Sequence, residues 1–209
     1  MDATPPRVRP QTRIQKRNRE AILDAALDAF SEAGYSGATL DRIAEGAGLS
    51  KPNLLYYFAS KEAIHAALLS ELMSDWLAPL RRLDPAGEPV DEIVDYVLAK
   101  LEMARRMPRE SRLFAGEILH GAPRMMDELT GPLRALVEEK ARLIGRWADE
   151  GRLAALDPRH LIFSIWATTQ HYADFDVQVR AVLMPESDTH LDQAAAFLEA
   201  FYRRALTPG

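Results

Sequence analysis

The chain has 209 residues, of which 47% are hydrophobic and 27% charged, enough for one large or two modest domains with a sizeable core. It contains no cysteine, which excludes disulfides and thiolate metal sites, and no apolar run approaches the roughly 18 residues of a membrane span. The N-terminus lacks the apolar core of a signal peptide, so we expect a cytoplasmic protein without membrane contact.

The net charge of −5 disfavours a polyanionic partner, but the basic residues are unevenly distributed. Residues 1–12 are rich in proline, and we expect them to form a disordered basic arm. Six Lys and Arg residues precede Ala21, against two acidic residues, which fits either an arm near an anionic polymer or a solvated tail. The six are Arg7, Arg9, Arg13, Lys16, Arg17 and Arg19.

The chain after this arm predicts three short or medium helices before residue 60. An apolar stripe at helical spacing over residues 13–33 predicts the first helix, which we expect Gly34 to end. Thr39 is a plausible N-cap for the second helix, and Ser50 for the third. Ser60 is expected to cap the helix that follows.

Two short helices joined by a turn that contains glycine predict a helix-turn-helix, whose second helix enters the DNA major groove by its N-terminal residues. Here Asn53 can pair with adenine, and Lys51 can reach guanine or a phosphate. The hydroxyls of Tyr56 and Tyr57 can donate to phosphates, and Lys61 would place a cation at a helix N-terminus. The alternative is a small three-helix unit with half-buried tyrosines, but the basic arm favours DNA.

The rest of the chain predicts further helices and no strand. An interruption is expected at residues 130–132, and Pro79 should disturb the end of the helix that Ser60 begins. We therefore expect an all-α fold, with an N-terminal three-helix helix-turn-helix domain and a C-terminal helical domain. The remaining helices are expected at about residues 90–107, 109–120, 132–151, 157–183 and 188–206.

One predicted helix, within residues 160–175, is mostly apolar but carries several polar side chains. Ile162, Trp166 and Gln170 share one helix face because they are spaced four residues apart. The ring of Trp166 can stack on a small flat heterocycle, and the Gln170 amide matches an imide edge of alternating C=O and N–H. The alternative is a core tryptophan beside a glutamine that bonds to backbone or bridges a dimer.

Residues 25–64, AALDAFSEAGYSGATLDRIAEGAGLSKPNLLYYFASKEAI, resemble the N-terminal domain of TetR-family transcriptional regulators. The resemblance implies a homodimeric DNA-binding protein without a cofactor. It further implies a DNA-binding domain at residues 13–60 and a domain at residues 61–209 that binds a small effector and dimerises. The implied DNA contacts are Thr39, Ser50, Lys51, Asn53, Tyr56, Tyr57 and Lys61, with Arg13 and Arg17 as accessory contacts.

A second resemblance, to the pyrimidine-utilisation branch of the TetR family, runs from the first helix to about Val179. The matching segments include WLAPL (residues 76–80) and IWATTQHYADF (residues 165–175). Members of this branch are repressors that respond to uracil and thymine, so the resemblance implies a pocket for one of these pyrimidines. The implied pocket residues are Trp76, Trp166 and Gln170, with Phe114, Glu117 and Tyr172 as further candidates in matched segments.

Dimerisation is expected through the last two helices, which would form a four-helix interface with those of the partner. Apolar residues on these helices can serve either this interface or the core of the protomer. They are Phe163, Ala167, Ala195, Phe197, Leu198 and Phe201.

Two alternative functions remain. An enzyme would have to use His160, His171 and Asp174, but no HExxH motif, phosphate-binding glycine loop or nucleophile elbow occurs. A regulator of the same fold could instead sense bulky hydrophobic molecules, although the pairing of Trp166 with Gln170 favours a small polar ligand.

Overall fold

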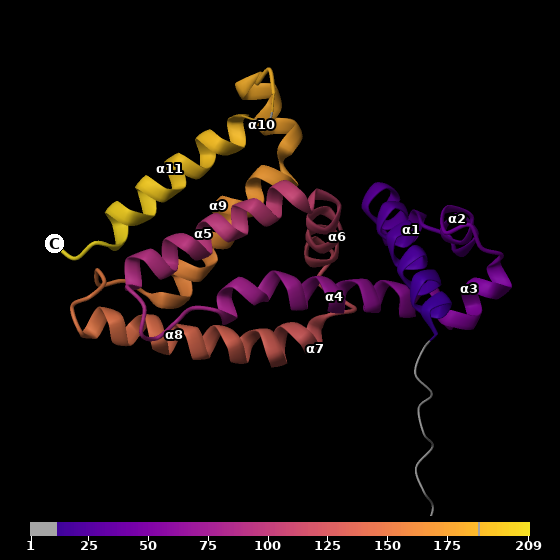
Figure 1. Ribbon diagram of the computed structural model, residues 1–209, viewed down its shortest axis with the longest axis horizontal. Helices are drawn as coiled ribbons and strands as arrows, with labels where there is room; N and C mark the ends of the chain where they lie inside the picture. Colours follow the sequence, from indigo (N-terminus) through magenta and orange to yellow (C-terminus); the bar gives the residue numbers. More distant parts are fainter. Residues whose placement is uncertain (1–11, 188) are drawn as a thin grey trace, which may run out of the picture. The chain divides into compact units, whose positions relative to one another are not determined.

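The computed structural model describes residues 12–187 and 189–209, and helices joined by short connections account for this part of the chain (Figure 1). Within these ranges no strand occurs, so the all-α fold class predicted from the sequence is confirmed. The expected disordered arm, apart from Thr12, lies outside the described residues. Nor does any helix in these ranges combine length and apolar character to the degree that a bilayer span requires.

The chain divides into two compact units, here called the N-terminal unit (residues 1–68) and the C-terminal unit (residues 69–209). The division falls inside one helix, α4 (Lys61–Arg81). The first residues of α4 therefore belong to the N-terminal unit, and its remainder belongs to the C-terminal unit. Pro79 is accommodated near the end of α4, and the helix continues to Arg81.

Three helices precede α4 in the N-terminal unit, and each begins at a side-chain cap. The side-chain oxygens of Thr12, Thr39 and Ser50 each accept a hydrogen bond from the backbone N–H three residues further on. Such a bond satisfies one of the N–H groups that have no partner inside the helix. The caps predicted at Thr39 and Ser50 are thus confirmed. The three helices are α1 (Arg13–Gly37), α2 (Leu40–Gly46) and α3 (Lys51–Tyr57).

Helix α1 has a break at the glycine where the sequence analysis expected it to end. Gly34 has a φ of 67°, in the left-handed region that glycine adopts without strain. The helix is therefore interrupted at the predicted residue, but it does not end there, because helical turns resume beyond Gly34 and reach Gly37.

The core of the N-terminal unit takes one fully buried aliphatic side chain from each of its helices. Ile22 of α1, Ile43 of α2, Leu54 of α3 and Ile64 of α4 are all 0% exposed. Burying a side chain of this size stabilises the fold by about 1.5–3 kcal/mol. Leu54 thereby anchors the short helix α3 and leaves most of its other side chains in solvent.

The C-terminal unit is a bundle in which α5 packs against α9 and α11, and α9 also packs against α6 and α8 (Figure 1). Asp157 caps α9 and Pro158 occupies its first position, as predicted. The helices after α4 are α5 (Pro89–Arg106), α6 (Pro108–Leu119), α7 (Met126–Glu128), the π-helical turn η1 (Leu129–Leu133), α8 (Arg134–Asp149), α9 (Pro158–Asp174), α10 (Asp176–Leu183) and α11 (Thr189–Leu206).

Two expectations for the C-terminal unit are wrong. The interruption predicted at residues 130–132 is a π-helical turn, whose wider hydrogen bonding accommodates Pro132 and leads directly into α8. The single helix predicted over residues 157–183 is two helices, because Phe175 leaves the helical conformation with φ −114° and ψ 27°. The ring of Phe175 stacks on His171 at this bend, with ring centroids 4.9 Å apart.

Candidate DNA-binding surface and effector cavity

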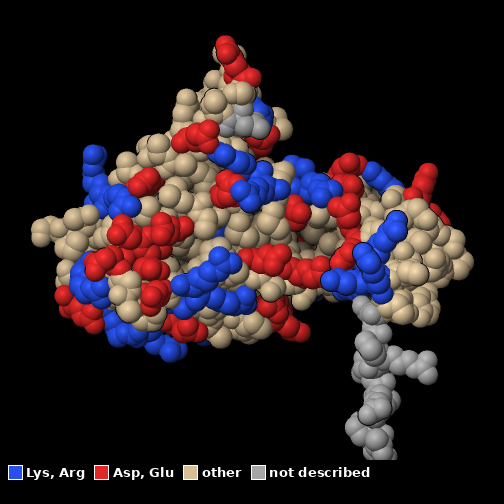
Figure 2. Space-filling model, in the orientation of Figure 1, with Lys and Arg blue, Asp and Glu red and all other residues tan. Residues whose placement is uncertain are grey.

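Helix α3 presents its polar side chains to solvent. Lys51 and Asn53 are exposed in its first turn, and Tyr56 is 70% exposed. Figure 2 shows that the surface over α3 is mostly uncharged, whereas charges of both signs are interspersed over the C-terminal unit. Exposed polar side chains of this kind can hydrogen-bond to base edges and to phosphate oxygens.

The two tyrosines of α3 are oriented by amide side chains of α1. The Tyr56 hydroxyl accepts a hydrogen bond from Gln15 Nε2 at 3.2 Å, and the Tyr57 hydroxyl accepts one from Asn18 Nδ2 at 3.0 Å. A hydroxyl that accepts in this way keeps its own hydrogen free to donate. Both hydroxyls can therefore still donate to phosphate oxygens. The sequence analysis missed Gln15 and Asn18.

Lys51 of α3 is already paired inside the N-terminal unit. Lys51 Nζ lies 2.9 Å from the Asp41 carboxylate. This exposed ion pair contributes little to stability in water, so Lys51 can exchange Asp41 for a phosphate.

Thr39 caps α2 by accepting from the Arg42 N–H at 3.2 Å. Arg13 and Arg17 are exposed on α1, as an accessory DNA contact requires.

Lys61 has a structural role that the sequence analysis missed. Its ammonium donates to the carbonyl oxygens of Tyr35 at 2.8 Å and Ala38 at 2.9 Å, and lies 4.4 Å from the centroid of the Tyr35 ring. Two of its three N–H groups therefore tie the end of α1 to the start of α4. Beside it, the Tyr35 hydroxyl donates to Glu62, and chiefly this bond lowers the pKa of the Glu62 carboxyl to about 2.

The C-terminal unit contains a small cavity of about 40 Å³ that brings together four of the six predicted pocket residues. Neither Glu117 nor Tyr172 lines it. The cavity is lined by Met73, Trp76 and Leu77 from α4, Lys100 from α5, Phe114 from α6, Leu133 from η1, and Trp166 and Gln170 from α9.

The two tryptophans of the cavity differ in their hydrogen bonding. Trp166 Nε1 donates to the Tyr96 hydroxyl at 2.6 Å. Trp76 is 5% exposed, and its Nε1 is buried without an acceptor in the described part of the chain. Its ring lies 5.2 Å from that of Phe114 at an interplanar angle of 60°. A buried indole N–H without a partner is costly, so the cavity holds a donor that an incoming acceptor can satisfy.

Lys100 is the charged residue among the four lining residues that the sequence analysis missed. It is 4% exposed, and its Nζ lies 4.6 Å from the centroid of the Trp76 ring. Burial lowers the pKa of Lys100 to about 8, and the negative charge of Asp174 partly opposes this shift. The signal was present in the sequence, because Lys100 lies three residues after Val97 and four before Ala104, on the buried stripe of α5.

Asp174 belongs to the surroundings of Lys100, on which its negative charge acts. Burial raises the pKa of the Asp174 carboxyl, against the hydrogen bond from Ser111 and the charges of His171, Lys100 and Arg112. Within residues 12–187 and 189–209, no cluster of three or more His, Asp or Glu side chains is arranged to hold a metal ion.

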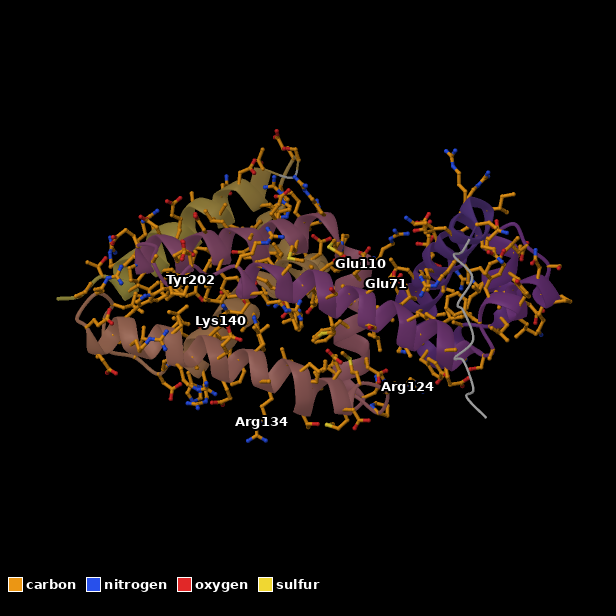
Figure 3. All side chains as sticks on the ribbon, turned by 60° about the horizontal axis from the view of Figure 1, so that its bottom comes forward. Glu71, Glu110, Arg124, Arg134, Lys140 and Tyr202 are labelled. Carbon is orange, nitrogen blue, oxygen red and sulfur yellow. The ribbon has the colours of Figure 1, made fainter. Side chains whose placement is uncertain are left out.

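Glu117 stabilises the turn after α6. It is 4% exposed, and its carboxylate accepts from the backbone N–H of Arg124 at 2.7 Å and from the Arg124 guanidinium at 3.2 Å. Figure 3 labels Arg124 in this turn. Tyr172 is half-buried beside His171, with ring centroids 6.3 Å apart.

The expected dimer residues separate into exposed and buried groups. Phe163 is 49% exposed, Phe197 62% and Phe201 51%, and the last two rings stack at 6.0 Å. Ala167 is exposed and Ala195 half-buried. Leu198 is only 2% exposed, so it belongs to the core of the protomer.

Comparison with known proteins covers both units. The family model of bacterial regulatory proteins of the tetR family matches residues 22–68, and that of the YcdC-like protein C-terminal region matches residues 69–209. The HTH-type transcriptional regulator RutR of Escherichia coli K12 is 53% identical over 172 residues, which cover 82% of this chain and 81% of RutR. The biofilm operon regulator IcaR of Staphylococcus aureus strain Newman is 45% identical over 47 residues, or 22% of this chain and 25% of IcaR.

Solved structures show the same fold. The transcriptional regulator SCO4942 of Streptomyces coelicolor has a TM-score of 0.74 at 24% identity, covering 92% of this chain and 99% of that one. AibR, crystallised with isovaleryl coenzyme A and operator DNA, has a TM-score of 0.68 at 17% identity, covering 88% and 97% of the two chains. The chain therefore belongs to the TetR family and is a DNA-binding transcriptional regulator with an N-terminal helix-turn-helix domain.

Proposed function

We propose that the chain is a repressor whose affinity for its operator is controlled by a small pyrimidine such as uracil or thymine. The observation that carries this proposal is the cavity in which Trp76, Trp166 and Gln170 meet. The pyrimidine class rests on the segments around these residues, which resemble the pyrimidine-utilisation branch of the TetR family. The effector acts alone, without a cofactor, and we place the repressor in the cytoplasm.

The lining of the cavity suits a flat ring with polar edges. Indole rings offer faces on which a heterocycle can stack, and the Gln170 amide offers one carbonyl acceptor and two N–H donors. An imide edge of alternating C=O and N–H can pair with such an amide. A ring that left these groups unpaired would lose roughly 1–3 kcal/mol per unsatisfied group.

The size of the cavity gives the effector a means of changing the protein. At about 40 Å³ it is well below the roughly 300 Å³ at the low end of small-molecule sites, so its lining must move to admit a ring. A ligand that binds only the opened state shifts the protein towards that state. A tenfold to hundredfold change in operator affinity requires about 1.4–2.7 kcal/mol of coupling.

Helix α4 belongs to both units and can therefore couple the cavity to the DNA-binding unit. Lys61 lies in its first turn and holds the end of α1, whereas Trp76 lies further along the same helix and lines the cavity. A ring that displaces Trp76 therefore acts on the helix that enters the DNA-binding unit.

Operator binding would use α3 together with flanking residues of the N-terminal unit. Asn53 and Lys51 are proposed to read bases, and the tyrosine hydroxyls to donate to phosphates. Lys61 keeps one N–H for a phosphate beyond the two that bind carbonyl groups. The proposed contacts are Arg13, Arg17, Thr39, Ser50, Lys51, Asn53, Tyr56, Tyr57 and Lys61.

The two alternative functions are less well supported. Membership of a family of transcriptional regulators answers the enzyme alternative. A sensor of bulky hydrophobic molecules would be expected to have a larger cavity poor in fixed polar groups. Lys100, Gln170 and the Trp76 N–H make this cavity polar.

The effector proposal can be tested with the purified full-length protein and an operator obtained by selection from random duplexes. We expect uracil and thymine to bind in calorimetric titrations and to weaken operator binding at least about tenfold. Gln170→Ala should remove this response, because the imide edge loses its partner. Gln178→Ala, at an exposed position of α10, is the matched control and should respond like the wild type. If millimolar uracil and thymine leave operator binding unchanged while lipophilic cations weaken it, the proposal is wrong.

A further inference from the structure

The C-terminal unit also has an open groove, here called the α4–α8 groove, which is separate from the cavity at Trp76. Its volume is about 450 Å³, within the range of roughly 300–1,000 Å³ that is typical of small-molecule sites. It lies where the end of α4, the π-helical turn η1 and the first half of α8 meet. No residue that lines the groove also lines the cavity. The lining residues are Arg81, Pro132, Ala135, Leu136, Glu139 and Lys140.

One of the two cations of the groove is buried. Lys140 is 7% exposed, and Figure 3 shows it turned inward from α8, whereas Arg134 on the same helix extends outward. Its Nζ lies 3.2 Å from the carboxylate of Glu139, whose side chain is 64% exposed. An ion pair with so exposed a carboxylate returns little of the hydration that a buried ammonium has lost. A second anion that excludes water from the groove would therefore stabilise the Lys140 ammonium.

Arg81 is the second cation of the groove, and it is exposed. Its Nη1 donates to the Ser74 carbonyl at 3.1 Å, but a guanidinium carries five N–H donors. Within residues 12–187 and 189–209, no Asp or Glu side chain forms an ion pair with Arg81. The planar fork of a guanidinium matches the two oxygens of a carboxylate. Two cations and the single carboxylate of Glu139 leave the groove with a net positive charge, so it favours an anion.

The remaining lining of the groove is apolar and includes an irregular turn. Pro132, Ala135 and Leu136 offer surface to the hydrocarbon part of a ligand. Pro132 belongs to η1, a single π-helical turn. Such turns are rare and occur frequently at functional sites. The turn therefore points to a ligand independently of the charges.

A groove of the N-terminal unit has the opposite charge. It lies between α1 and α2 and has a volume of about 340 Å³. Its one guanidinium, Arg42, is paired with Glu32, and three further carboxylates surround it, so an anion is repelled. The positive charge of the α4–α8 groove is thus a property of that site and not of grooves on this chain in general. The charged residues of the N-terminal groove are Asp24, Asp28, Glu32, Arg42 and Glu45.

We propose that the α4–α8 groove is a second ligand-binding site and that it takes a small organic carboxylate. Arg81 binds the carboxylate through its planar fork, Lys140 donates to one of the carboxylate oxygens, and the apolar side chains contact the hydrocarbon part. Inorganic phosphate fits less well, because it has no apolar part and its second negative charge exceeds the net charge of the groove. The inference does not depend on the proposed function, since the two sites share no lining residue.

The ligand class can be tested by calorimetric titration of the full-length protein with hexanoate and benzoate. Hexanamide and benzamide keep the shape of these acids but remove the charge. We expect at least one acid to bind, and its amide and inorganic phosphate to bind at least about tenfold more weakly, the equivalent of one charge-assisted hydrogen bond.

Variants of the two cations locate the site. Arg81→Met and Lys140→Met keep much of the side-chain length and should each lower the affinity for the bound acid at least about tenfold. Arg134→Met is the matched control, because it removes a cation from the same helix outside the groove, and it should bind within about twofold of the wild type. Circular dichroism and the mass of the protein in solution check that each variant folds.

The outcomes decide both the site and the class of ligand. Wild-type protein that binds neither acid would overturn the inference, and so would an acid that folded Arg81→Met and Lys140→Met proteins bind as tightly as the wild type. Equal losses in Arg134→Met would show attraction by general charge and would overturn the site. An amide or phosphate that binds as tightly as the acid would overturn the carboxylate class. A uracil titration of the same proteins tests the proposed function separately.

Discussion

The burial of Lys100 lowers the stability of the fold, and this unfavourable free energy points to a function for the residue. A buried lysine loses the hydration of its ammonium, and the Trp76 ring and the charge of Asp174 return only part of it. A methionine of similar length would fill the same space without this loss. A residue that lowers stability at a cavity is most readily explained by what the cavity binds.

The first prediction at the residue scale concerns the pH dependence of stability. The Lys100 pKa is about 8 in the folded protein and 10.5 as its ordinary value. Between these values the unfolded chain holds more protons, so the contribution of Lys100 makes the free energy of unfolding rise with pH. Below pH 8 Lys100 is charged in both the folded and the unfolded protein, so its burial lowers the free energy of unfolding by the full amount. Lys100→Met should therefore be more stable at pH 7, by up to about 3 kcal/mol, and the difference should shrink towards pH 10.

Urea denaturation of both proteins at pH 7, 8, 9 and 10 measures this difference, and subtraction removes the titration of the other lysines and tyrosines. A constant difference between the two proteins across this range would contradict the burial of an ionised Lys100.

At the scale of elements, α3 depends on its neighbours for both position and chemistry. The Ser50 cap starts it and Leu54 anchors it in the core, but seven residues are too few for a helix that is stable alone. Its tyrosine hydroxyls are oriented from α1, by Gln15 and Asn18. Substitution of a base-reading side chain of α3 and substitution of a phosphate-binding one should therefore have different effects on DNA binding.

Asn53→Ala is expected to weaken operator binding by about 1–3 kcal/mol but to leave binding to a scrambled duplex almost unchanged, since a base contact is lost. Tyr57→Phe should weaken binding to both duplexes by similar factors, since a phosphate donor is lost. Fluorescence anisotropy titrations with the two duplexes at one salt concentration measure these effects. If Asn53→Ala loses the same affinity for both duplexes, Asn53 does not read a base.

At the scale of the whole molecule, the exposed apolar surface of the C-terminal unit indicates a partner. Phe163, Phe197 and Phe201 expose large rings on α9 and α11, the helices from which we propose the four-helix dimer interface. A dimer presents two copies of α3 to one operator, and their separation decides whether both half-sites can be occupied. Dimerisation is thus part of the proposed mechanism of repression.

Phe197→Asp should convert the dimer to a monomer at micromolar concentration, because a buried unpaired carboxylate in the interface is strongly unfavourable. Operator affinity should fall with it. Leu119→Asp is the control, since Leu119 is 84% exposed on α6 and should not affect assembly. Analytical ultracentrifugation distinguishes the two masses, and a Phe197→Asp protein that remains dimeric would place the interface elsewhere.

Local chemistry made much of this molecule predictable from its sequence. The caps at Thr39, Ser50 and Asp157, and the break at Gly34, follow from residues within one turn of the feature they create. Helical periodicity identified the all-α class, and the motif around α3 identified the helix-turn-helix. The bend at Phe175 escaped prediction because neither glycine nor proline marks it.

Only the tertiary structure decided which side chains meet across elements. Trp76, Lys100, Phe114 and Gln170 come from four helices, and their convergence depends on packing that no short segment contains. The same packing directed Glu117 to Arg124 and away from the cavity. By itself, the sequence determined the helices and the residues available to DNA and ligand. Their partners depended on the tertiary fold, because contacts between residues distant in the chain form only when the helices pack.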